Sequence, residues 1–138
     1  MIRVRKLTDY AAVLLAYMFK NIDKNISAKL LAQKTNIPIP TVSKVLKILA
    51  KKQLISSKRG LRGGYKILRK PEEISVAEMI GALEGPIAIT ECTLKGDLVC
   101  YIGKSCPARG LWREINKAVN TALQGLSLAQ VVNDFKKS

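Results

Sequence analysis

Residues 36–68, NIPIPTVSKVLKILAKKQLISSKRGLRGGYKIL, contain the pattern that decides the fold. Pro38 and Pro40 mark the start of a helix, because proline has no N–H and the first helical turn needs none. Apolar residues then recur at spacings of three and four, which predicts a helix to about Gln53. Next, two short runs flank a tip rich in glycine and arginine, a pattern typical of a β-hairpin. The apolar stripe of the helix consists of Val42, Val45, Leu46 and Leu49.

Two further helices are predicted upstream of this stretch. The first covers about residues 9–20, with Thr8 as its N-cap. The second is short, covers about residues 28–34, begins after the capping residue Ser27 and ends at Asn36. A short helix, a tight turn and a longer helix form a helix-turn-helix, and the hairpin after them is the wing of a winged helix. The side chains expected to face inward from the short helix are Leu30 and Leu31.

The second half of the chain contains a long amphipathic helix. Ser75 opens a helix that ends at Gly85, and a polar, irregular stretch then covers residues 90–106. The longest helix is predicted over about residues 107–124, and a last short helix ends near Phe135. One apolar stripe on the long helix comprises Leu111, Trp112, Ile115, Ala118, Val119, Ala122, Leu123 and Leu126.

We therefore predict a mainly α fold with a small β-hairpin wing, a winged helix-turn-helix joined to a long dimerisation helix. The DNA-binding domain covers residues 1–70, the connecting helix and cysteine cluster loop residues 71–106, and the dimerisation helix with a short C-terminal helix residues 107–138. The apolar stripe of the long helix needs a partner. A second copy of the chain would give a two-fold homodimer that matches a palindromic operator. The alternative is that the stripe packs on its own winged domain.

The positive charge is concentrated in one half of the chain. Residues 1–70 contain 17 lysines and arginines against two acidic residues, whereas residues 71–138 contain 7 against 8. Such a basic half favours an anionic partner, double-stranded DNA or an anionic membrane surface, over lysines that only aid solubility. The longest apolar run, residues 11–19, is too short to cross a membrane, and no cleavage site follows it. We expect a cytoplasmic DNA-binding protein with no membrane partner and no small-molecule substrate.

The expected DNA contacts lie on the third helix, the wing and the N-terminus. Side chains of the helix would read the major groove, the wing arginines would reach the minor groove or phosphates, and further lysines would meet phosphates. The helix residues are Thr41, Ser43, Lys44 and Lys47, the wing residues are Arg59 and Arg62, and the phosphate contacts are Lys6, Lys51 and Lys58.

Three cysteines lie close together in the polar stretch. Cys92, Cys100 and Cys106 are separated by seven and five residues, and the chain has no histidine. Thiolates bind zinc and iron–sulfur clusters, but a set of three without a fourth ligand is incomplete. From spacing alone the alternatives are a metal centre, a thiol redox sensor and three unremarkable thiols. The missing histidine argues against an enzyme or electron carrier.

The whole pattern resembles the IscR/NsrR family of winged-helix transcriptional regulators, which carry an iron–sulfur cluster. Within that family it is most similar to the regulators of the SUF iron–sulfur assembly operon. The resemblance extends over about residues 2–132, and its most specific element is the cysteine loop leading into Leu111-Trp112-Arg113. The other family-like segments are residues 6–10, 57–65, 74–78 and 82–86.

The resemblance implies a homodimer with one cluster per subunit, held by Cys92, Cys100 and Cys106. The histidine that IscR-like members place three residues after the third cysteine is replaced here by Arg109. Members similar to NsrR use an N-terminal aspartate of the other subunit, and Asp9 matches that position. The alternative role for Asp9 is a carboxylate stabilised by a helix N-terminus. A 2Fe–2S cluster is the favoured type, and 4Fe–4S is the alternative.

The function that follows is a transcriptional regulator whose operator binding depends on the cluster, with iron–sulfur assembly genes as targets. A repressor that senses by thiol chemistry without a cluster is the alternative. A DNA-compacting protein of low specificity is disfavoured by the wing and the cysteine loop.

Overall fold

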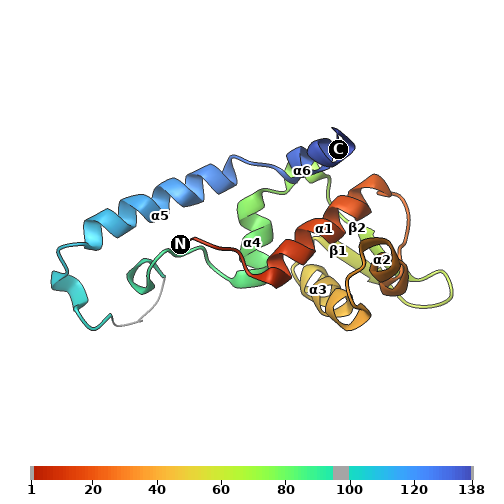
Figure 1. Cartoon of the computed structure of the whole chain (residues 1–138), viewed down its shortest axis with the longest axis horizontal. Helices are drawn as coiled ribbons and strands as arrows, with labels where there is room; N and C mark the ends of the chain where they lie inside the picture. Colours follow the sequence, from red (N-terminus) through yellow and green to blue (C-terminus); the bar gives the residue numbers. More distant parts are fainter. Residues whose placement is uncertain (1, 95–99, 138) are drawn as a thin grey trace.

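The computed structural model describes residues 2–94 and 100–137, and within them the chain folds into helices and one antiparallel hairpin (Figure 1). The helices are α1 (Lys6–Lys20), α2 (Ala28–Thr35), α3 (Ile39–Lys51), α4 (Val76–Glu84), α5 (Arg109–Gln124) and α6 (Leu128–Lys137). The strands are β1 (Ile55–Lys58) and β2 (Gly64–Ile67), and short 3-10 turns occur at η1 (Pro71–Glu73), η2 (Glu91–Thr93) and η3 (Gly103–Ser105). The predicted mainly helical fold with a two-stranded wing is confirmed. None of the described helices is long and apolar enough to cross a membrane.

The first part of the molecule, which we call the head, consists of α1–α4, the β1–β2 hairpin and α6. Its buried side chains form one cluster, to which every one of these elements contributes. The predicted stripe of α3 is confirmed, since its four residues are fully buried. Leu128 and Val132 of α6 also belong to this core, so the end of the chain returns to pack on α1. The head therefore has a closed core of its own.

Hydroxyl caps begin two of the helices, as the sequence predicts. The Ser27 hydroxyl accepts a hydrogen bond from the Leu30 N–H at 3.1 Å, and Ser75 accepts one from the Glu78 N–H at 3.0 Å. The prediction that Thr8 caps α1 is wrong. The helix begins one turn earlier, after Arg5, and Thr8 is buried within its first turns. A tertiary contact from α4 satisfies this end instead.

The short helix α2 packs with one leucine rather than two. Leu31 is fully buried, but Leu30 is 39% exposed, so the inward orientation predicted for Leu30 is wrong. Adjacent residues of a helix point about 100° apart, so Leu30 lies at the edge of the face that Leu31 and Ala32 bury. Asn36 ends it in the left-handed conformation, as expected from its position after the last apolar residue.

The wing is a hairpin whose second strand is also paired with a third segment. Strands β1 and β2 pair from Ile55–Ile67 to Lys58–Gly64. Ile26, before α2, exchanges two backbone hydrogen bonds of 2.8 Å with Tyr65. This close approach needs a glycine at position 64, because a Cβ there would lie 2.7 Å from the Ile26 carbonyl oxygen. Strand β2 of the wing is thus fixed to the head next to the wing loop.

The second part of the molecule, which we call the arm, covers residues 87–94 and 100–126. Figure 1 shows α5 extending away from the head, with the end of the cysteine segment at its far end; the wing tip lies at the opposite end of the molecule. No side chain of α5 is buried in this chain. The predicted stripe divides into two faces. Trp112, Ile115, Val119 and Leu123 are half-buried, whereas Leu111, Ala118, Ala122 and Leu126 are exposed.

Candidate nucleic-acid interface and metal centre

The basic face of α3 lies opposite its buried stripe. Lys44, Lys47 and Lys51 are all exposed, whereas Thr41 and Ser43 are half-buried. Within the part of the chain that the structure describes, none of the three lysines has an ion-pair partner. Uncompensated cations on one helix face raise the local positive potential and attract phosphates.

The wing carries a second group of exposed cations. Lys58 is the last residue of β1, and Arg59 and Arg62 lie in the loop that follows. All three side chains are exposed, and in the described residues none of them forms an ion pair. The α3 face and the wing tip are therefore two cationic surfaces on one rigid head, an arrangement suited to adjacent grooves of a duplex.

The N-terminal candidates Lys6 and Asp9 lie one turn apart at the start of α1. The Lys6 ammonium is 3.5 Å from the Asp9 carboxylate and 5.0 Å from the ring centre of Tyr10. Both side chains of the pair are mostly exposed. An exposed pair contributes little to stability, so Asp9 remains accessible to a ligand or a second chain.

The three cysteines lie on the arm and are free thiols of intermediate exposure. Cys92 is in η2, where its sulfur is 3.0 Å from the Thr90 hydroxyl, and Cys106 follows η3 at the approach to α5. The described residues of a single chain contain no group of three cysteine, aspartate or glutamate side chains close enough to hold a metal ion. Residues 95–99, between Cys92 and Cys100, lie outside the described residues.

The donor types in the cysteine segment nevertheless suit an iron–sulfur cluster. Cysteine thiolates are the usual protein ligands of such clusters, and the three partly exposed thiols supply three of the usual four. Arg109, the first residue of α5, takes the place of the expected histidine, and a guanidinium cannot be deprotonated to ligate a metal. Its buried Nε has no hydrogen-bond acceptor among residues 2–94 and 100–137. A buried donor without an acceptor is uncommon. An anionic group bound at this end of α5 would supply the acceptor that Nε lacks.

Two asparagines of α5 hold the segment that leads to Cys92. The Asn116 side-chain oxygen accepts from the Ile89 N–H at 2.9 Å, and the Asn120 amide donates to the Ile87 carbonyl at 3.3 Å. They lie four residues apart, which places them on the half-buried face of the helix. The link between the head and Cys92 is therefore fixed along α5 by hydrogen bonds to its backbone.

Helix α4 joins the head to the arm and is fastened at both ends. At its C-terminal end, the Glu84 carboxylate accepts from the Thr8 hydroxyl at 2.7 Å and from the Arg5 N–H at 2.8 Å. The hydrogen bond from Thr8, with a smaller contribution from Arg5, lowers the pKa of Glu84. Glu84 thus supplies from α4 the cap that α1 lacks in its own sequence.

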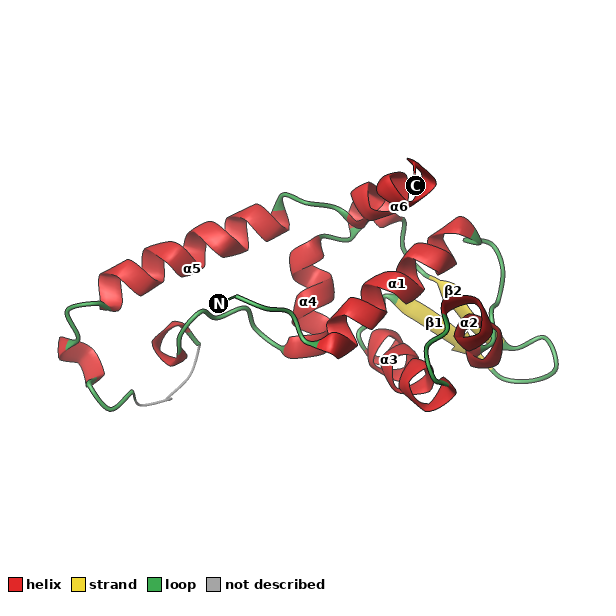
Figure 2. Cartoon of the chain, in the orientation of Figure 1, coloured by secondary structure: helices red, strands yellow, loops and turns green. Residues whose placement is uncertain are grey.

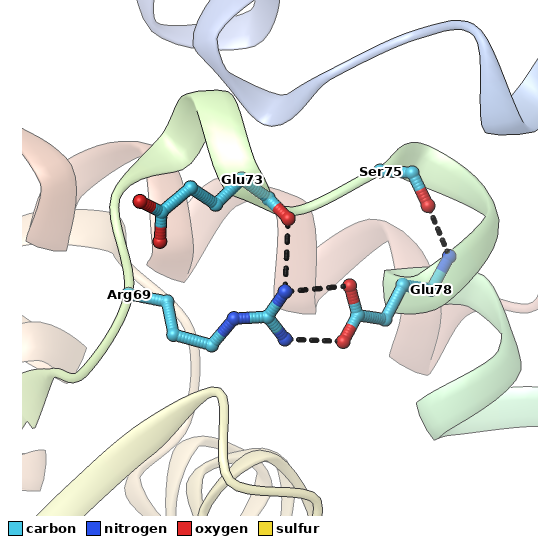
Figure 3. A network of polar contacts seen from close by, with 4 residues as sticks. All are labelled: Arg69, Glu73, Ser75 and Glu78. Atoms are coloured by element: carbon cyan, nitrogen blue, oxygen red, sulfur yellow. Dashed lines mark hydrogen bonds and ion pairs between the residues drawn. The ribbon is translucent and has the colours of Figure 1, made fainter.

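At its N-terminal end, α4 is fastened to the wing (Figure 3). The Arg69 guanidinium forms a two-pronged ion pair with the Glu78 carboxylate and also donates to the Glu73 carbonyl at 2.8 Å. The hydrogen bond to Glu78 raises the pKa of Arg69, so the pair stays charged. Because Arg69 follows β2 closely, the wing and α4 are held to each other.

Only weak signals in the sequence point to these fastening residues. Asn116 and Asn120 are poor helix formers placed four apart beside an apolar stripe, a pattern that can indicate a polar contact. Glu84 and Arg69 are charged residues at the ends of predicted elements, where charge usually means only solvent exposure. Apart from the Glu73 carbonyl, four residues from Arg69, their partners lie nine to 79 residues away, so spacing could not identify them.

Comparisons with known proteins agree on one family. A family model described as Rrf2, iron-dependent transcriptional regulator, matches residues 4–134. The chain is 30% identical over 104 residues to the HTH-type transcriptional regulator IscR of Aliivibrio salmonicida, covering 75% of this chain and 61% of that protein. It is 31% identical over 112 residues to protein rrf2 of Nitratidesulfovibrio vulgaris, covering 81% and 74%. The chain thus spans about three fifths of the length of the IscR relative.

A solved structure has the same fold. CymR, the global cysteine regulator of B. subtilis, superposes with a TM-score of 0.76 at 27% identity. The match covers 96% of this chain and 98% of that one, so it includes the arm as well as the head.

Proposed function

The chain belongs to the Rrf2 family of transcriptional regulators, and from that membership we propose that it binds a palindromic operator as a homodimer under the control of an iron–sulfur cluster. Proteins of this family are DNA-binding regulators rather than enzymes. The observation that carries the proposal is that the cations and the thiols lie on separate parts of one chain. The head has exposed cations on α3 and the wing, and the arm has three free thiols. Its proposed targets are iron–sulfur assembly genes, and its proposed location is the cytoplasm, with the chromosome.

On DNA, the proposed roles follow from the exposure and the charge of the head. Exposed and half-buried polar side chains of α3 read the major groove, while the wing arginines enter the minor groove or meet phosphates. The remaining lysines bind phosphates, where contacts are independent of sequence. Major-groove residues are Thr41, Ser43, Lys44 and Lys47, wing residues are Arg59 and Arg62, and phosphate contacts are Lys6, Lys51 and Lys58.

The DNA placement is tested by the salt dependence of binding. The probe is a duplex enriched from a random-sequence library by the wild-type protein. Lys51→Ala should weaken binding to all duplexes and lower the slope of log K against log salt by about two, because a homodimer loses one phosphate contact in each subunit. Lys117→Ala, an exposed lysine on α5, is the matched control and should bind normally. Equal behaviour of the two variants would contradict the placement.

For the homodimer, we propose that the exposed apolar face of α5 packs on the same face of a second copy. Leu111, Ala118, Ala122 and Leu126 have no cover in a single chain, and a two-fold interface buries one face against itself. Ala118→Lys should give monomers in sedimentation velocity and weaken operator binding. Thr121→Lys, on the exposed polar side of the helix, should leave the dimer intact. A monomeric wild-type protein that binds its operator tightly would refute this interface.

For the cluster, the proposed ligands are Cys92, Cys100 and Cys106, with Asp9 of a second subunit as the fourth. When bound, the cluster would supply a redox- and iron-responsive centre, favoured as 2Fe–2S with 4Fe–4S as the alternative. The role of the chain is to pass a change in the cysteine segment to the head. Asn116 and Asn120 hold the link along α5, and Glu84 connects α4 to the turn of α1 next to Asp9.

The decisive experiment is a visible absorption spectrum, with iron and acid-labile sulfide analysis, on protein purified without oxygen. Absorption between roughly 300 and 600 nm with stoichiometric iron and sulfide supports the cluster. Each Cys→Ser variant should lose it, and Asp9→Ala should change its spectrum or stability, whereas Asp23→Ala should not. Colourless protein that cannot be reconstituted would refute the cluster while leaving DNA binding intact.

One observation favours a second candidate, a regulator that senses by thiol chemistry without a cluster. The thiols are partly exposed, and in the described residues of one chain they do not gather into a ligand group. The similar CymR is itself described as a cysteine regulator. In that case, a thiol oxidant should change operator binding of iron-free protein, and a reductant should restore it.

A further inference from the structure

The tip of the wing carries one large apolar side chain between its cations. Leu61 is 109% exposed relative to an extended chain, more than any other large apolar residue in the described part of the protein. It lies between Arg59 and Arg62, both also exposed. Single exposed leucines are common on protein surfaces. The position of Leu61 in the loop, however, indicates a contact outside the chain.

The backbone of the loop forces Leu61 to the apex. The Gly63 N–H donates to the Gly60 carbonyl at 3.0 Å, which closes a four-residue turn with Leu61 and Arg62 in its two central positions. Gly60 has a φ of +109°, and a Cβ on Gly63 would lie 2.2 Å from the Lys58 carbonyl oxygen. The turn is therefore tight at its base, and its central side chains point away from the head.

Neither the turn nor the core of the protein explains the leucine. Central turn positions favour proline, aspartate, asparagine, serine or glycine, for backbone reasons that leucine does not satisfy. No other side chain covers it within the residues that the structure describes, as its full exposure shows. A contact outside the chain is the remaining reason for a large apolar residue at this point.

We propose that Leu61 is an apolar minor-groove contact, inserted between the cations of the wing against the sugar walls and base edges of the operator. This inference rests on the proposed function and adds a residue to it. Arginines are drawn to narrow minor grooves, and proteins that use this groove often pair such cations with an apolar wedge. The surrounding Lys58, Arg59 and Arg62 match a polyanion, which favours DNA over a protein partner as the occupant.

The proposed contact has a distinctive signature, because apolar burial does not release counterions. Affinities for the selected operator duplex would be measured by fluorescence anisotropy over a series of salt concentrations. Leu61→Ala should weaken binding by about 10-fold or more at every salt concentration with an unchanged salt slope, since each subunit of the homodimer loses about three carbon atoms from an apolar contact. Arg62→Ala should instead lower the slope. Leu61→Met should retain most of the affinity.

The matched control is Leu68→Ala, a leucine that is 55% exposed but lies just after β2 at the base of the hairpin. It should bind as the wild type does. Leu61→Ala binding equal to wild type would overturn the inference, and so would a change in salt slope. If Lys47→Ala and Arg59→Ala lose affinity while Leu61→Ala does not, only this inference fails. If none of the three changes binding, the proposed DNA placement fails with it.

Discussion

The head and the arm of this protein differ in how much of their apolar surface is buried within the single chain. In the head, helices, hairpin and α6 surround one core with fully buried leucines, isoleucines and valines. On the arm, α5 extends away from the other helices (Figure 2). None of its side chains is buried in this chain, and the three thiols are half-exposed. A helix with an apolar face gains most of its stability by packing that face. The head can therefore specify its own fold, whereas the arm depends on something outside the single chain.

The two regions meet at α4, which is fastened more firmly to the head than to the arm. Glu84 binds the start of α1, and Arg69 ties the wing to Glu78. After α4, Gly85 adopts a positive φ of 82° and Pro86 follows. The other end of the arm is also attached to the head, since the Val76 N–H donates to the Leu126 carbonyl at 2.8 Å and the Leu128 N–H donates to the Ile74 carbonyl at 2.9 Å. The arm is therefore joined to the head at two places, at Gly85 and at residues 126–128.

The largest difference between the regions should appear in the effect of removing a leucine. Leu46→Ala, in the core of the head, should lower the free energy of unfolding by about 2–5 kcal/mol because it leaves a cavity. Leu111→Ala, 57% exposed on α5, should change it by less than about 0.5 kcal/mol in monomeric protein. Urea denaturation at low protein concentration measures both. Similar effects of the two substitutions would show that the arm has a core of its own.

A smaller contrast should appear when glycines receive a side chain. Gly64→Ala should destabilise by about 1–3 kcal/mol, since φ is +139° and the Cβ would meet the Ile26 backbone. Gly110→Ala, in α5 with open space around it, should instead stabilise by about 0.5–1 kcal/mol through helix propensity. Thermal unfolding followed by circular dichroism gives both signs. A destabilising Gly110→Ala would mean that other groups pack closely against this end of α5.

Removing a hydrogen bond that attaches the cysteine segment to α5 should have a smaller effect, confined to the arm. Asn116→Ala removes the acceptor for the Ile89 N–H, a hydrogen bond that contributes about 0.5–1.5 kcal/mol. Hydrogen exchange at the Ile89 amide should speed up by roughly threefold to tenfold, the rate change that this energy predicts. Amides of α3 should keep their protection. Gln124→Ala, exposed on the same helix, is the control. An equal loss of protection at Ile89 and in α3 would show that the arm and the head do not open independently.

The smallest expected effect is a dependence on pH at the junction. Because the pKa of Glu84 is lowered from its ordinary value of 4.5, its ionised form stabilises the folded protein. That contribution is complete above pH 4.5 and disappears as the pH falls through the lower folded pKa. Glu84→Gln should be slightly less stable at neutral pH and should show less of this acid dependence. The free energy of unfolding would be measured against pH for both proteins. Curves of identical shape would exclude a contribution of ionised Glu84 to stability.

The success of prediction follows the same division between local and distant contacts. The α3 stripe, the wing and the serine caps are predictable because they depend on neighbours within a few residues. The cap prediction for Thr8 fails because its hydroxyl bonds to Glu84, 76 residues away, rather than to its own helix. The prediction for Leu30 fails because adjacent helical residues point about 100° apart, and α2 turns Leu31 rather than Leu30 to the core. The ligand roles of the cysteines and Asp9 remain predictions, since they depend on a second chain and a bound group.

Local patterns in the amino-acid sequence are enough to specify the helix-turn-helix, the wing and the basic surface. Periodicity, capping and turn chemistry act between near neighbours. The net charge of a segment can be counted from its sequence without knowing the fold. How these parts are joined was visible only in the folded chain. Folding placed α6 in the core of the head, gave α1 a cap from Glu84, and divided the α5 stripe into a face bound to residues 87–93 and a face left open. Those outcomes depend on contacts between residues far apart in the chain, which no local pattern encodes.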